Sequence, residues 1–552
     1  MDIIRTSASH LSEHATLYVG AVSSLLLYAV YKAILYPRFF SPMRSYPGPQ
    51  THWLFGNVFD ILGSEPGRSY MEWHKQYGPV IRTIAPFPGY ENISFTSYSA
   101  LKTILVDRAY DFPKPSYLRD LLGIAAGYGL LTLEGSEHQE LRRWMNPAFR
   151  LNFLHEHFDI YHKPISSLVD IVSNDIKSNE SKDGKVFEVT KLINSCLMDI
   201  ICLTAFGYEC DSLHNEDQPL ANAYHSLVNL QNLPNLLTFF GVVTLPGGAR
   251  IAKSAVRSSW VGPLLTRLND LTGNTFLGPI ASFVRNMRQV NVISQQLLNE
   301  KLSEAHQLQK AGNSLDGGKI DVLSLMVKAS LDKDSPYKMD GEALSSQMLT
   351  FLGAGHETTA SGAAWALWEL ASHRSIQEKL RKECQELIAR NSTPGYQDIK
   401  HLRYLNNFVQ EVMRLRPPTP QTARQAAKDS MVDGVFVPKG TGVFIASRVV
   451  NEDEKIWGSD AHEFNPDRWD ALPEKYDSTF SMLTFIAGPH HCIGRNMAIM
   501  ELKALLCVLV ANFDFTPAQA TPKETSAITM KPEGGLYLRL KRLNPADVLT
   551  QQ

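Results

Sequence analysis

The spacing of apolar and polar residues predicts a chain that is mostly helical. Apolar positions recur every three or four residues from about 158 to 309, with a polar break at 173–185, and again over 342–372. This is the spacing of one face of a helix. Residues 79–84 and 92–96 are instead rich in β-branched or aromatic side chains and favour strands. The expected fold class is therefore mainly α with small β-sheets (α+β).

The N-terminal segment is apolar over a length that suits a membrane. Residues 15–31 contain no charged side chain, and the apolar pattern continues past Lys32 to Tyr36. A helix needs about 20 apolar residues to span a bilayer. Lys and Arg are denser after this segment than before it, which places the N-terminus in the lumen and the body in the cytoplasm. A cleaved signal peptide is disfavoured because little positive charge precedes the segment.

The prolines that follow predict a stiff, extended connector, which would hold the body at a set angle to the membrane. The expected organisation is a lumenal N-terminus (1–14), a single transmembrane anchor (15–36), a proline-rich hinge (37–60), a folded body (61–540) and a C-terminal tail (541–552).

Charge and cysteine content narrow the function classes. The 54 Lys and Arg residues nearly balance the 56 Asp and Glu residues, so the chain lacks the basic excess expected of a nucleic-acid-binding protein. Six cysteines in 552 residues, with no Cys-x-x-Cys pair, indicate free thiols in a reducing compartment.

One cysteine stands in an unusual setting. Residues 485–494 read Phe-Ile-Ala-Gly-Pro-His-His-Cys-Ile-Gly, and a helix pattern begins at Arg495. Gly488 and Gly494 allow a turn that brings backbone N–H groups close to the sulfur of Cys492. These amides and the helix N-terminus favour a thiolate. Such a thiolate could be a nucleophile, a structural cysteine or an axial haem ligand.

This stretch resembles the haem-ligand loop of the cytochrome P450 monooxygenases, Phe-x-x-Gly-x-Arg-x-Cys-x-Gly. Phe485, Gly488, Cys492 and Gly494 match, whereas His490 stands where the family most often has arginine. The resemblance implies that Cys492 is the axial ligand of the haem iron, that Phe485 and Gly488 shape the cofactor site, and that His490 contacts a haem propionate.

Other segments match the family in the same order along the chain. His138 and Arg142, four residues apart on a predicted helix, match positions that reach a haem propionate, and so does Arg424. Segments matching the family's pocket lining are 123–131, 419–423 and 527–530. The apolar stretch 232–248 could roof that pocket, enter the membrane surface or belong to the core.

The middle of the predicted long helix carries further chemistry. Residues 354–359 read Ala-Gly-His-Glu-Thr-Thr, a poor helix interior in which a hydroxyl competes for a backbone carbonyl. In the family this segment widens beside the iron to admit dioxygen. By resemblance, Thr358 would orient water and hydrogen-bond the oxygen, and Glu357 would feed protons inward; both are the predicted catalytic residues.

A charge triad is expected to have a structural role. Glu411 and Arg414 lie three apart on a predicted helix and precede Leu-Arg-Pro-Pro, as in the family. Arg468 would join them. A partly buried triad of this kind fixes geometry more than it adds stability.

The resemblance implies a haem monooxygenase that inserts one oxygen atom of O2 into a lipophilic small molecule, by hydroxylation or epoxidation, in specialised metabolism. The implied cofactor is haem b (iron protoporphyrin IX), and the implied site is the endoplasmic reticulum membrane, with the catalytic domain facing the cytoplasm. No flavin or nicotinamide fingerprint is evident, so a separate NADPH-dependent reductase would supply electrons. Candidates for its docking surface are Arg142, Arg143, Arg495 and Lys503.

Three alternatives stay open at this point. The first is a haem-thiolate isomerase or dehydratase that uses no O2, against which Thr358 and Glu357 argue. The second is a membrane-tethered haem- or sterol-binding protein without activity. The third is a zinc site through His490, His491 and Cys492, which lacks a second ligand pair at finger spacing.

Overall fold

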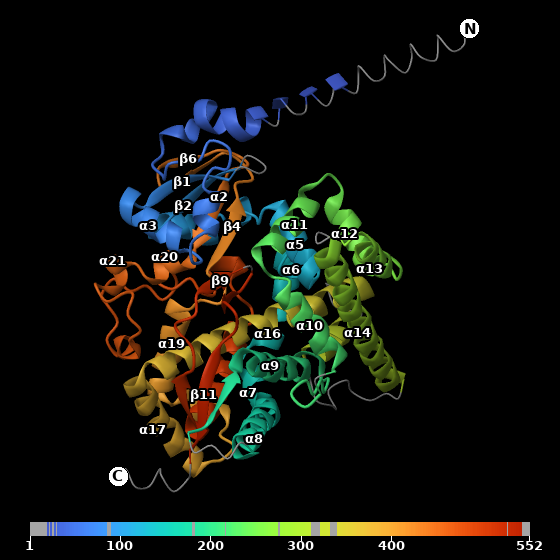
Figure 1. The fold of residues 1–552 in the computed structure, drawn as a ribbon, viewed down its shortest axis with the longest axis vertical. Helices are drawn as coiled ribbons and strands as arrows, with labels where there is room; N and C mark the ends of the chain where they lie inside the picture. The colour runs from blue at the N-terminus through green and yellow to red at the C-terminus, as the bar shows by residue number, and fades with distance from the viewer. Residues whose placement is uncertain are drawn as a thin grey trace, which may run out of the picture. The chain divides into compact units, whose positions relative to one another are not determined.

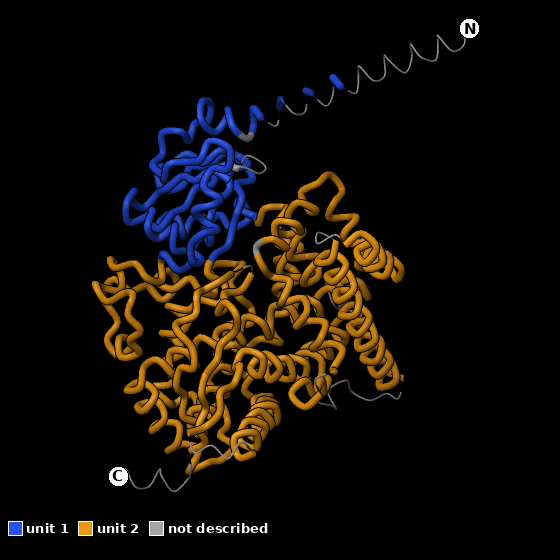
Figure 2. The backbone as a smooth tube through the Cα atoms, in the orientation of Figure 1, with its two compact units in different colours: residues 1–113, 421–449 blue, residues 114–420, 450–552 orange. Residues whose placement is uncertain are grey.

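The computed structural model describes residues 19–20, 23–24, 27–28, 30–85, 90–178, 183–215, 217–273, 277–310, 321–331, 339–526 and 528–543. The chain forms two compact units, shown in blue and orange in Figure 2. Unit 1 combines residues 1–113 with 421–449, and unit 2 combines 114–420 with 450–552. Both units are therefore built from segments that are distant in sequence.

Unit 1 contains most of the β-structure of the N-terminal third. Its elements are η1 (Tyr31–Phe40), η2 (Pro42–Ser45), α2 (Val58–Leu62), α3 (Arg68–Tyr77), β1 (Val80–Ala85), β2 (Tyr90–Phe95), α4 (Tyr98–Lys102), η3 (Thr103–Asp107), η4 (Ala109–Asp111), β4 (Gln421–Gln425), β5 (Ser430–Val432), β6 (Val435–Val437) and β7 (Gly442–Ala446). Helix α20 (Ser447–Asn451) crosses the sequence boundary between the units.

A four-stranded sheet in the order β1-β2-β7-β4 organises unit 1 (Figure 1). Strands β1 and β2 form an antiparallel hairpin in which Arg82 pairs with Ile93, and β2 pairs in parallel with β7. A second, two-stranded sheet joins β5 to β6. A small core that includes Tyr70 and Ile81 packs beneath this region. The predicted strands at 79–84 and 92–96 are confirmed, displaced by one or two residues.

Unit 2 is mostly helical. Its elements are α5 (Ser116–Ala126), α6 (Gly135–Met145), η5 (Asn146–Phe149), α7 (Leu151–Glu156), η6 (Phe158–Tyr161), α8 (His162–Ser178), β3 (Lys185–Glu188), α9 (Val189–Phe206), α10 (Pro219–Asn229), α11 (Leu233–Thr244), α12 (Gly248–Arg257), α13 (Val261–Thr272), α14 (Leu277–Lys310), α15 (Val322–Leu331), α16 (Gly341–Ser372), α17 (Arg374–Arg390), α18 (Tyr396–Lys400), α19 (Arg403–Leu415), α21 (Glu454–Trp457), η7 (Pro466–Asp470), η8 (Gly488–His490), α22 (Arg495–Asn512), β8 (Phe513–Pro517), β9 (Glu524–Ser526), β10 (Met530–Pro532) and β11 (Tyr537–Arg542).

Helix α16 is the central helix of unit 2. Asp340 caps its N-terminus by accepting a hydrogen bond from the Ala343 amide. Most of its residues are buried, and apolar or small side chains occur all round it, as expected of a core helix. Helices α9, α14, α19 and α22 pack against it. The predicted helix over 342–372 is confirmed.

Two small sheets complete unit 2: β3-β11-β8 and β10-β9. The β9–β10 ribbon returns to the central helix, because the Trp365 indole donates to the Met530 carbonyl from 3.2 Å. The structure therefore confirms a mainly helical fold with small sheets.

Three details of the predicted elements are wrong. Residues 37–45 of the connector are largely helical, in the second half of η1 and in η2, where an extended chain was expected. The polar break at 173–185 begins later, because α8 continues to Ser178. The glycine-containing segment at 123–131 begins inside α5, which ends where Gly127 adopts a φ of 78°. A side chain at Gly127 would collide with the Ser346 carbonyl, so this close approach requires glycine.

The expected anchor at 15–36 lies partly outside the described residues. Among the residues that are described, one helix, α9, is long and apolar enough to cross a membrane. Two-thirds of it is buried within the protein and it packs against α16, so it is a core helix of unit 2.

Candidate haem site

The cysteine loop is a tight turn that ends at the N-terminus of α22. Ile486 and Gly488 both have positive φ values, 55° and 74°, and the Cys492 amide donates to the Phe485 carbonyl from 2.9 Å. Gly488 thus supplies left-handed backbone, as its place in the motif predicts. Gly494 has a φ of −83°, so its role is not conformational.

The sulfur of Cys492 accepts hydrogen bonds from backbone N–H groups, but these do not bring the pKa of the thiol below its ordinary value. The amides of Gly494 and Arg495 donate to it, and the charges of Arg142 and Arg495 also favour its ionised form. Desolvation by the surrounding protein is nevertheless the largest effect and raises the pKa of the thiol, although the side chain remains accessible to solvent. The amides therefore act in the predicted direction, but burial outweighs them.

Helix α6 contacts the cysteine loop through both predicted residues. The imidazole of His138 is buried and lies against that of His490, with ring centroids 4.1 Å apart. One turn later, the Arg142 guanidinium donates to the His491 carbonyl from 2.6 Å and lies 2.8 Å from its Nε2 atom. The structure thus brings His138, Arg142, His490 and Cys492 together around one loop.

Two residues of this cluster were missed by sequence reasoning. Glu134 accepts a hydrogen bond from the Lys114 amide at 3.0 Å, and its other oxygen lies 3.5 Å from His490 Nε2. Lys114 Nζ is 3.8 Å from Glu134. Burial, together with Lys114 and Arg142, lowers the pKa of His138 to about 4. Neither residue belongs to a recognised short motif, and only the fold brings them to the loop.

The donor set of this cluster fits an acidic, iron-bearing cofactor. Lys114, Arg142 and two imidazoles can donate to carboxylates, whereas the cluster itself contains one carboxylate, that of Glu134. The thiol of Cys492 is a soft ligand that suits iron. By contrast, no group of three or more His, Cys, Asp or Glu side chains that could hold a metal ion occurs in the described part of the chain, which argues against the zinc alternative.

The predicted catalytic segment forms an uninterrupted stretch of α16. Thr358 Oγ1 donates to the Ala354 carbonyl at 2.8 Å, and Thr359 Oγ1 donates to the Gly355 carbonyl at 3.2 Å. The expected competition of hydroxyls for backbone carbonyls is therefore present. Ala354 is exposed and Thr358 is partly exposed, although most of the helix is buried. The Thr358 oxygen lone pairs remain able to accept a hydrogen bond.

Glu357 is held in a buried polar network. Its Oε1 atom lies 2.6 Å from Lys531 Nζ and accepts from Thr529 Oγ1 at 2.6 Å, while Oε2 accepts from Gln231 Nε2 at 3.1 Å. Burial would raise the pKa of this carboxyl, but Lys531 and Thr529 outweigh burial, so the pKa lies below its ordinary value. Glu357 is therefore ionised at neutral pH. Its partner Lys531 was not predicted, although it directly follows the predicted pocket-lining segment 527–530. Residue 527 of that segment lies outside the described residues.

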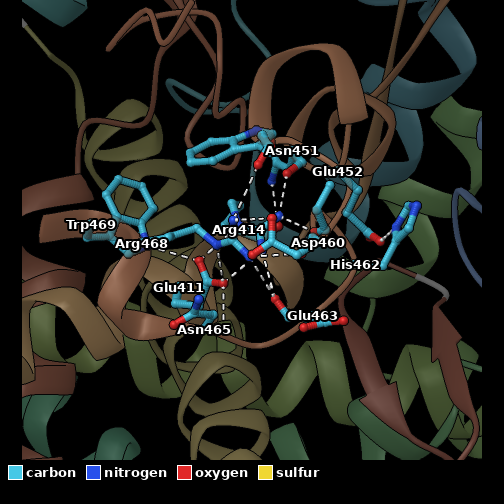
Figure 3. Close-up of polar contacts among 12 residues, drawn as sticks. Glu411, Arg414, Asn451, Glu452, Asp460, His462, Glu463, Asn465, Arg468 and Trp469 are labelled. Carbon is cyan, nitrogen blue, oxygen red and sulfur yellow. Dashed lines mark hydrogen bonds and ion pairs between the residues drawn. The ribbon is translucent and has the colours of Figure 1, made fainter. Parts of the chain in front are cut away.

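The predicted charge triad is present and completely buried at its centre (Figure 3). The Glu411 carboxylate accepts both Nε and NH2 of Arg414, at 2.9 and 2.8 Å, and neither side chain is exposed. Arg468 Nε donates to the same carboxylate from 2.9 Å, as do the Asn465 amide at 2.9 Å and the Trp469 indole at 3.0 Å. Every lone pair of the buried carboxylate therefore has a donor.

Asn451 connects this triad to the cysteine loop. Its carbonyl accepts from Arg414 NH1 at 2.9 Å (Figure 3). Its side chain donates to Thr484 Oγ1 at 3.0 Å. Its Oδ1 atom accepts from the Leu483 amide at 2.8 Å. Since Phe485 begins the loop, the triad positions the segment from which Cys492 extends.

The remaining predicted residues have mixed positions. Arg424 is buried in β4 of unit 1 and donates to Thr422 Oγ1 at 3.0 Å, so its contact with a propionate stays a prediction. Arg143 and Arg495 are exposed. Lys503 is partly buried, and desolvation lowers its pKa to about 8, so it is still mostly protonated at neutral pH but is less accessible than Arg143 and Arg495.

Comparison with known proteins agrees with this geometry. Residues 46–539 match the family model described as Cytochrome P450. The chain is 30% identical over 519 residues to cytochrome P450 monooxygenase sphH of Aspergillus fumigatus, covering 92% of this chain and 89% of that protein. It is 31% identical over 525 residues to cytochrome P450 monooxygenase 128 of Postia placenta, covering 90% of this chain and 91% of that protein. Pig cytochrome P450 3A29 is 28% identical over 531 residues, 94% of each chain.

The fold and these similarities define an oxidoreductase that uses thiolate-bound haem iron. The chain belongs to the cytochrome P450 family, and it is a monooxygenase, an enzyme that incorporates oxygen from O2. Most of the relatives named as monooxygenases are fungal, which confirms the fungal type that the motifs resemble.

Proposed function

We propose that this monooxygenase binds haem b through Cys492 and inserts one oxygen atom of O2 into a lipophilic small molecule. The observation that carries the proposal is the cysteine loop: a thiol at the N-terminus of α22 accepts two backbone N–H groups beside the cationic cluster of α6. When bound through Cys492, the haem would supply the oxygen chemistry, and its iron would favour the ionised form of this thiol.

The residues around the loop would bind and orient the cofactor. Arg142, His138 and His490 would donate to the haem propionates, with Lys114 as an additional donor; the predicted contact from Arg424 is part of the proposal. His490 replaces the usual arginine, but its imidazole still offers N–H groups from a buried position 3.5 Å from Glu134. Phe485 and Gly488 would fix the shape of the loop, and Arg495 lies over the Phe485 ring at 5.7 Å.

Thr358 and Glu357 would manage protons. The Thr358 hydroxyl donates to the Ala354 carbonyl, and its oxygen can accept a hydrogen bond from a water molecule. Glu357 is ionised through Lys531, and Lys531 is only partly buried. A proton could therefore pass from solvent through the Lys531–Glu357 pair towards Thr358.

Glu411, Arg414 and Arg468 would keep the cysteine loop in place. The Asn451 contacts to Leu483 and Thr484 support this role, because they carry the position of the triad to the start of the loop.

Electrons would come from a separate NADPH-dependent reductase, and the protein would be anchored in the endoplasmic reticulum membrane by residues 15–36, with its body in the cytoplasm. The membrane proposal is supported by the apolar N-terminal sequence and by exposed apolar side chains on α11 to α13 and the adjoining turns, namely Leu237, Leu245, Ile251, Trp260, Leu264, Leu268 and Leu271. Arg143 and Arg495 remain the best candidates for reductase docking.

The substrate would be lipophilic, and the pathway one of specialised metabolism. The fungal monooxygenases to which the chain is similar support this class of enzyme.

The test is the absorption spectrum of the reduced protein exposed to carbon monoxide. We expect the far-shifted Soret band of sulfur-ligated haem, and we expect Cys492→Ser to abolish it while Cys210→Ser, which changes a cysteine far along the chain, retains it. A sulfur-type band that survives in Cys492→Ser would disprove the ligand assignment. Product formation with O2, NADPH and reductase then tests the reaction itself.

A further inference from the structure

A cavity lies at the N-terminal end of α16, and the cysteine loop does not line it. Its volume is about 610 Å3, within the range of small-molecule sites. Its walls come from α5, α12, α14 and α16, all within unit 2. None of Thr358, Glu357 or Cys492 lines it.

The walls of this cavity carry an excess of positive charge. Lys253, Arg257 and Arg288 line it together with a single carboxylate, Glu342. Arg257 NH2 and Lys253 Nζ both approach Glu342 Oε1, at 2.7 and 3.3 Å. Two cations therefore share one oxygen atom, and Arg288 donates to a neutral group, the Arg257 carbonyl, from 2.9 Å. The positive end of the α16 dipole adds to this field.

The rest of the lining is divided between polar and apolar surfaces. Asn291, Gln295 and Asn299 recur every four residues and so present amides from one face of α14. Ile124 and Leu349 provide an apolar wall. A ligand that fits both surfaces has an anionic head and an apolar body.

The cavity is separated from the catalytic segment by the end of α5. The Thr350 hydroxyl donates to the Ala126 carbonyl at 2.8 Å, and Gly127 lies directly against Ser346. Leu349 is the cavity-lining residue of α16 that is nearest to Thr358, nine residues away along the same helix. At 1.5 Å per residue, their separation along the axis is about 14 Å.

We propose that this cavity is a second ligand site, for an amphipathic carboxylic acid. The carboxylate would be held by Arg257, Lys253 and Arg288, and the hydrocarbon part would lie against Ile124 and Leu349. Glu342 already shows that a carboxylate fits between Arg257 and Lys253. It therefore acts as an internal competitor, which an incoming acid must displace. Gly123, Ile124, Gly127 and Tyr128 line this cavity and also belong to the predicted pocket-lining segment 123–131, so the site adjoins the proposed substrate pocket and shares part of its wall.

The test uses octanoate as the probe, titrated calorimetrically into the full-length, haem-loaded protein in lipid nanodiscs, with empty nanodiscs as the blank. We expect octanoate to bind at least tenfold more tightly than octanol, which lacks the charge, and than acetate, which lacks the chain. Equal binding of octanoate and octanol would overturn the proposal, as would equal binding of octanoate and acetate.

Three variants separate this site from octanoate bound elsewhere. Arg257→Gln should weaken octanoate binding about tenfold, because a charge-assisted hydrogen bond is lost. Glu342→Gln should strengthen it several-fold, because the competing carboxylate is gone. Arg250→Gln, an exposed position on the same helix outside the cavity, should leave it unchanged. Opposite shifts in the first two variants cannot arise from general destabilisation, and the absence of any shift in both would refute the site. Because heat of binding is measured without turnover, the result is distinguishable from failure of the proposed monooxygenase reaction.

Discussion

Lys531 Nζ lies 2.6 Å from Glu357 Oε1, in a network that also includes Thr529 and Gln231. The two charged residues are 174 positions apart, on α16 and β10, and the contact explains how a carboxylate that is almost fully buried stays ionised. Without Lys531, burial would dominate and raise the pKa of Glu357.

Lys531→Met is therefore expected to protonate Glu357 at neutral pH. Infrared spectroscopy should detect a new protonated carboxyl band that disappears in the double variant with Glu357→Gln. In the unsubstituted protein the depressed pKa stabilises the fold above the ordinary carboxyl pKa of 4.5, and this contribution is lost as pH falls through the folded-state pKa. Lys523→Met, an exposed lysine nearby in sequence, is the control. A Glu357 that remains ionised in Lys531→Met would contradict the role of this ion pair.

Thr358→Ala should uncouple NADPH consumption from product formation, because the variant lacks the hydroxyl oxygen that would accept a hydrogen bond from a water molecule. We expect product per NADPH to fall several-fold, and Thr358→Ser to restore most of it. The stability change should stay within about 1 kcal/mol, since the lost bond to the Ala354 carbonyl is a neutral side-chain contact. Full, coupled turnover in the alanine variant would instead favour an isomerase or dehydratase that does not use O2.

Removing one partner of the buried Glu411–Arg414 pair should be costly. Glu411→Gln leaves Arg414 buried without its counter-charge, and about 3–5 kcal/mol of unfolding free energy should be lost. Haem retention should fall as well, because Asn451 ties Arg414 to the start of the cysteine loop.

A matched control for this triad lies on the same helix. Arg403 forms an exposed pair with Asp470, at 2.9 Å, so Arg403→Gln should change stability by less than about 1 kcal/mol. Denaturant titration and the haem-to-protein ratio provide both measurements. Similar losses of unfolding free energy in Glu411→Gln and Arg403→Gln would show that burial does not determine how much stability an ion pair contributes.

Glu501, a buried carboxyl on α22, should make stability depend on pH. Burial raises its pKa from 4.5 to about 8, and the side-chain contact with Thr359 opposes this only in part. The unfolded chain releases this proton near pH 4.5, whereas the folded protein holds it up to about pH 8. Stability should therefore decline as pH rises through this interval, by a total on the order of 5 kcal/mol.

Glu501→Gln cannot lose a proton, so its stability relative to the unsubstituted protein should increase between pH 5 and pH 9. The measurement compares the unfolding free energies of Glu501→Gln and the unsubstituted protein from pH 5 to pH 9. A loss of stability caused by the amide itself is the same at every pH, so it does not affect how the difference changes with pH. A difference that is flat with pH would mean that Glu501 is ionised in the folded state.

Local pattern was sufficient for the helices and for the contacts that are close in sequence. The helical spacing of apolar residues predicted α16, and the three-residue spacing of Glu411 and Arg414 placed their side chains together. Glycine at 488 predicted a left-handed turn because other residues rarely adopt that backbone. These features depend on interactions within one or two helical turns, which a sequence displays directly.

Only the tertiary structure decided which distant residues meet. Lys531 beside Glu357, Lys114 and Glu134 beside His490, and the cationic cavity at α16 all join separate segments, and no periodicity encodes such pairings. The pKa of Cys492 likewise depends on tertiary structure that the sequence does not display. The sequence revealed the amides that lower it, whereas the desolvation that raises it depends on how many protein atoms the fold packs around the sulfur.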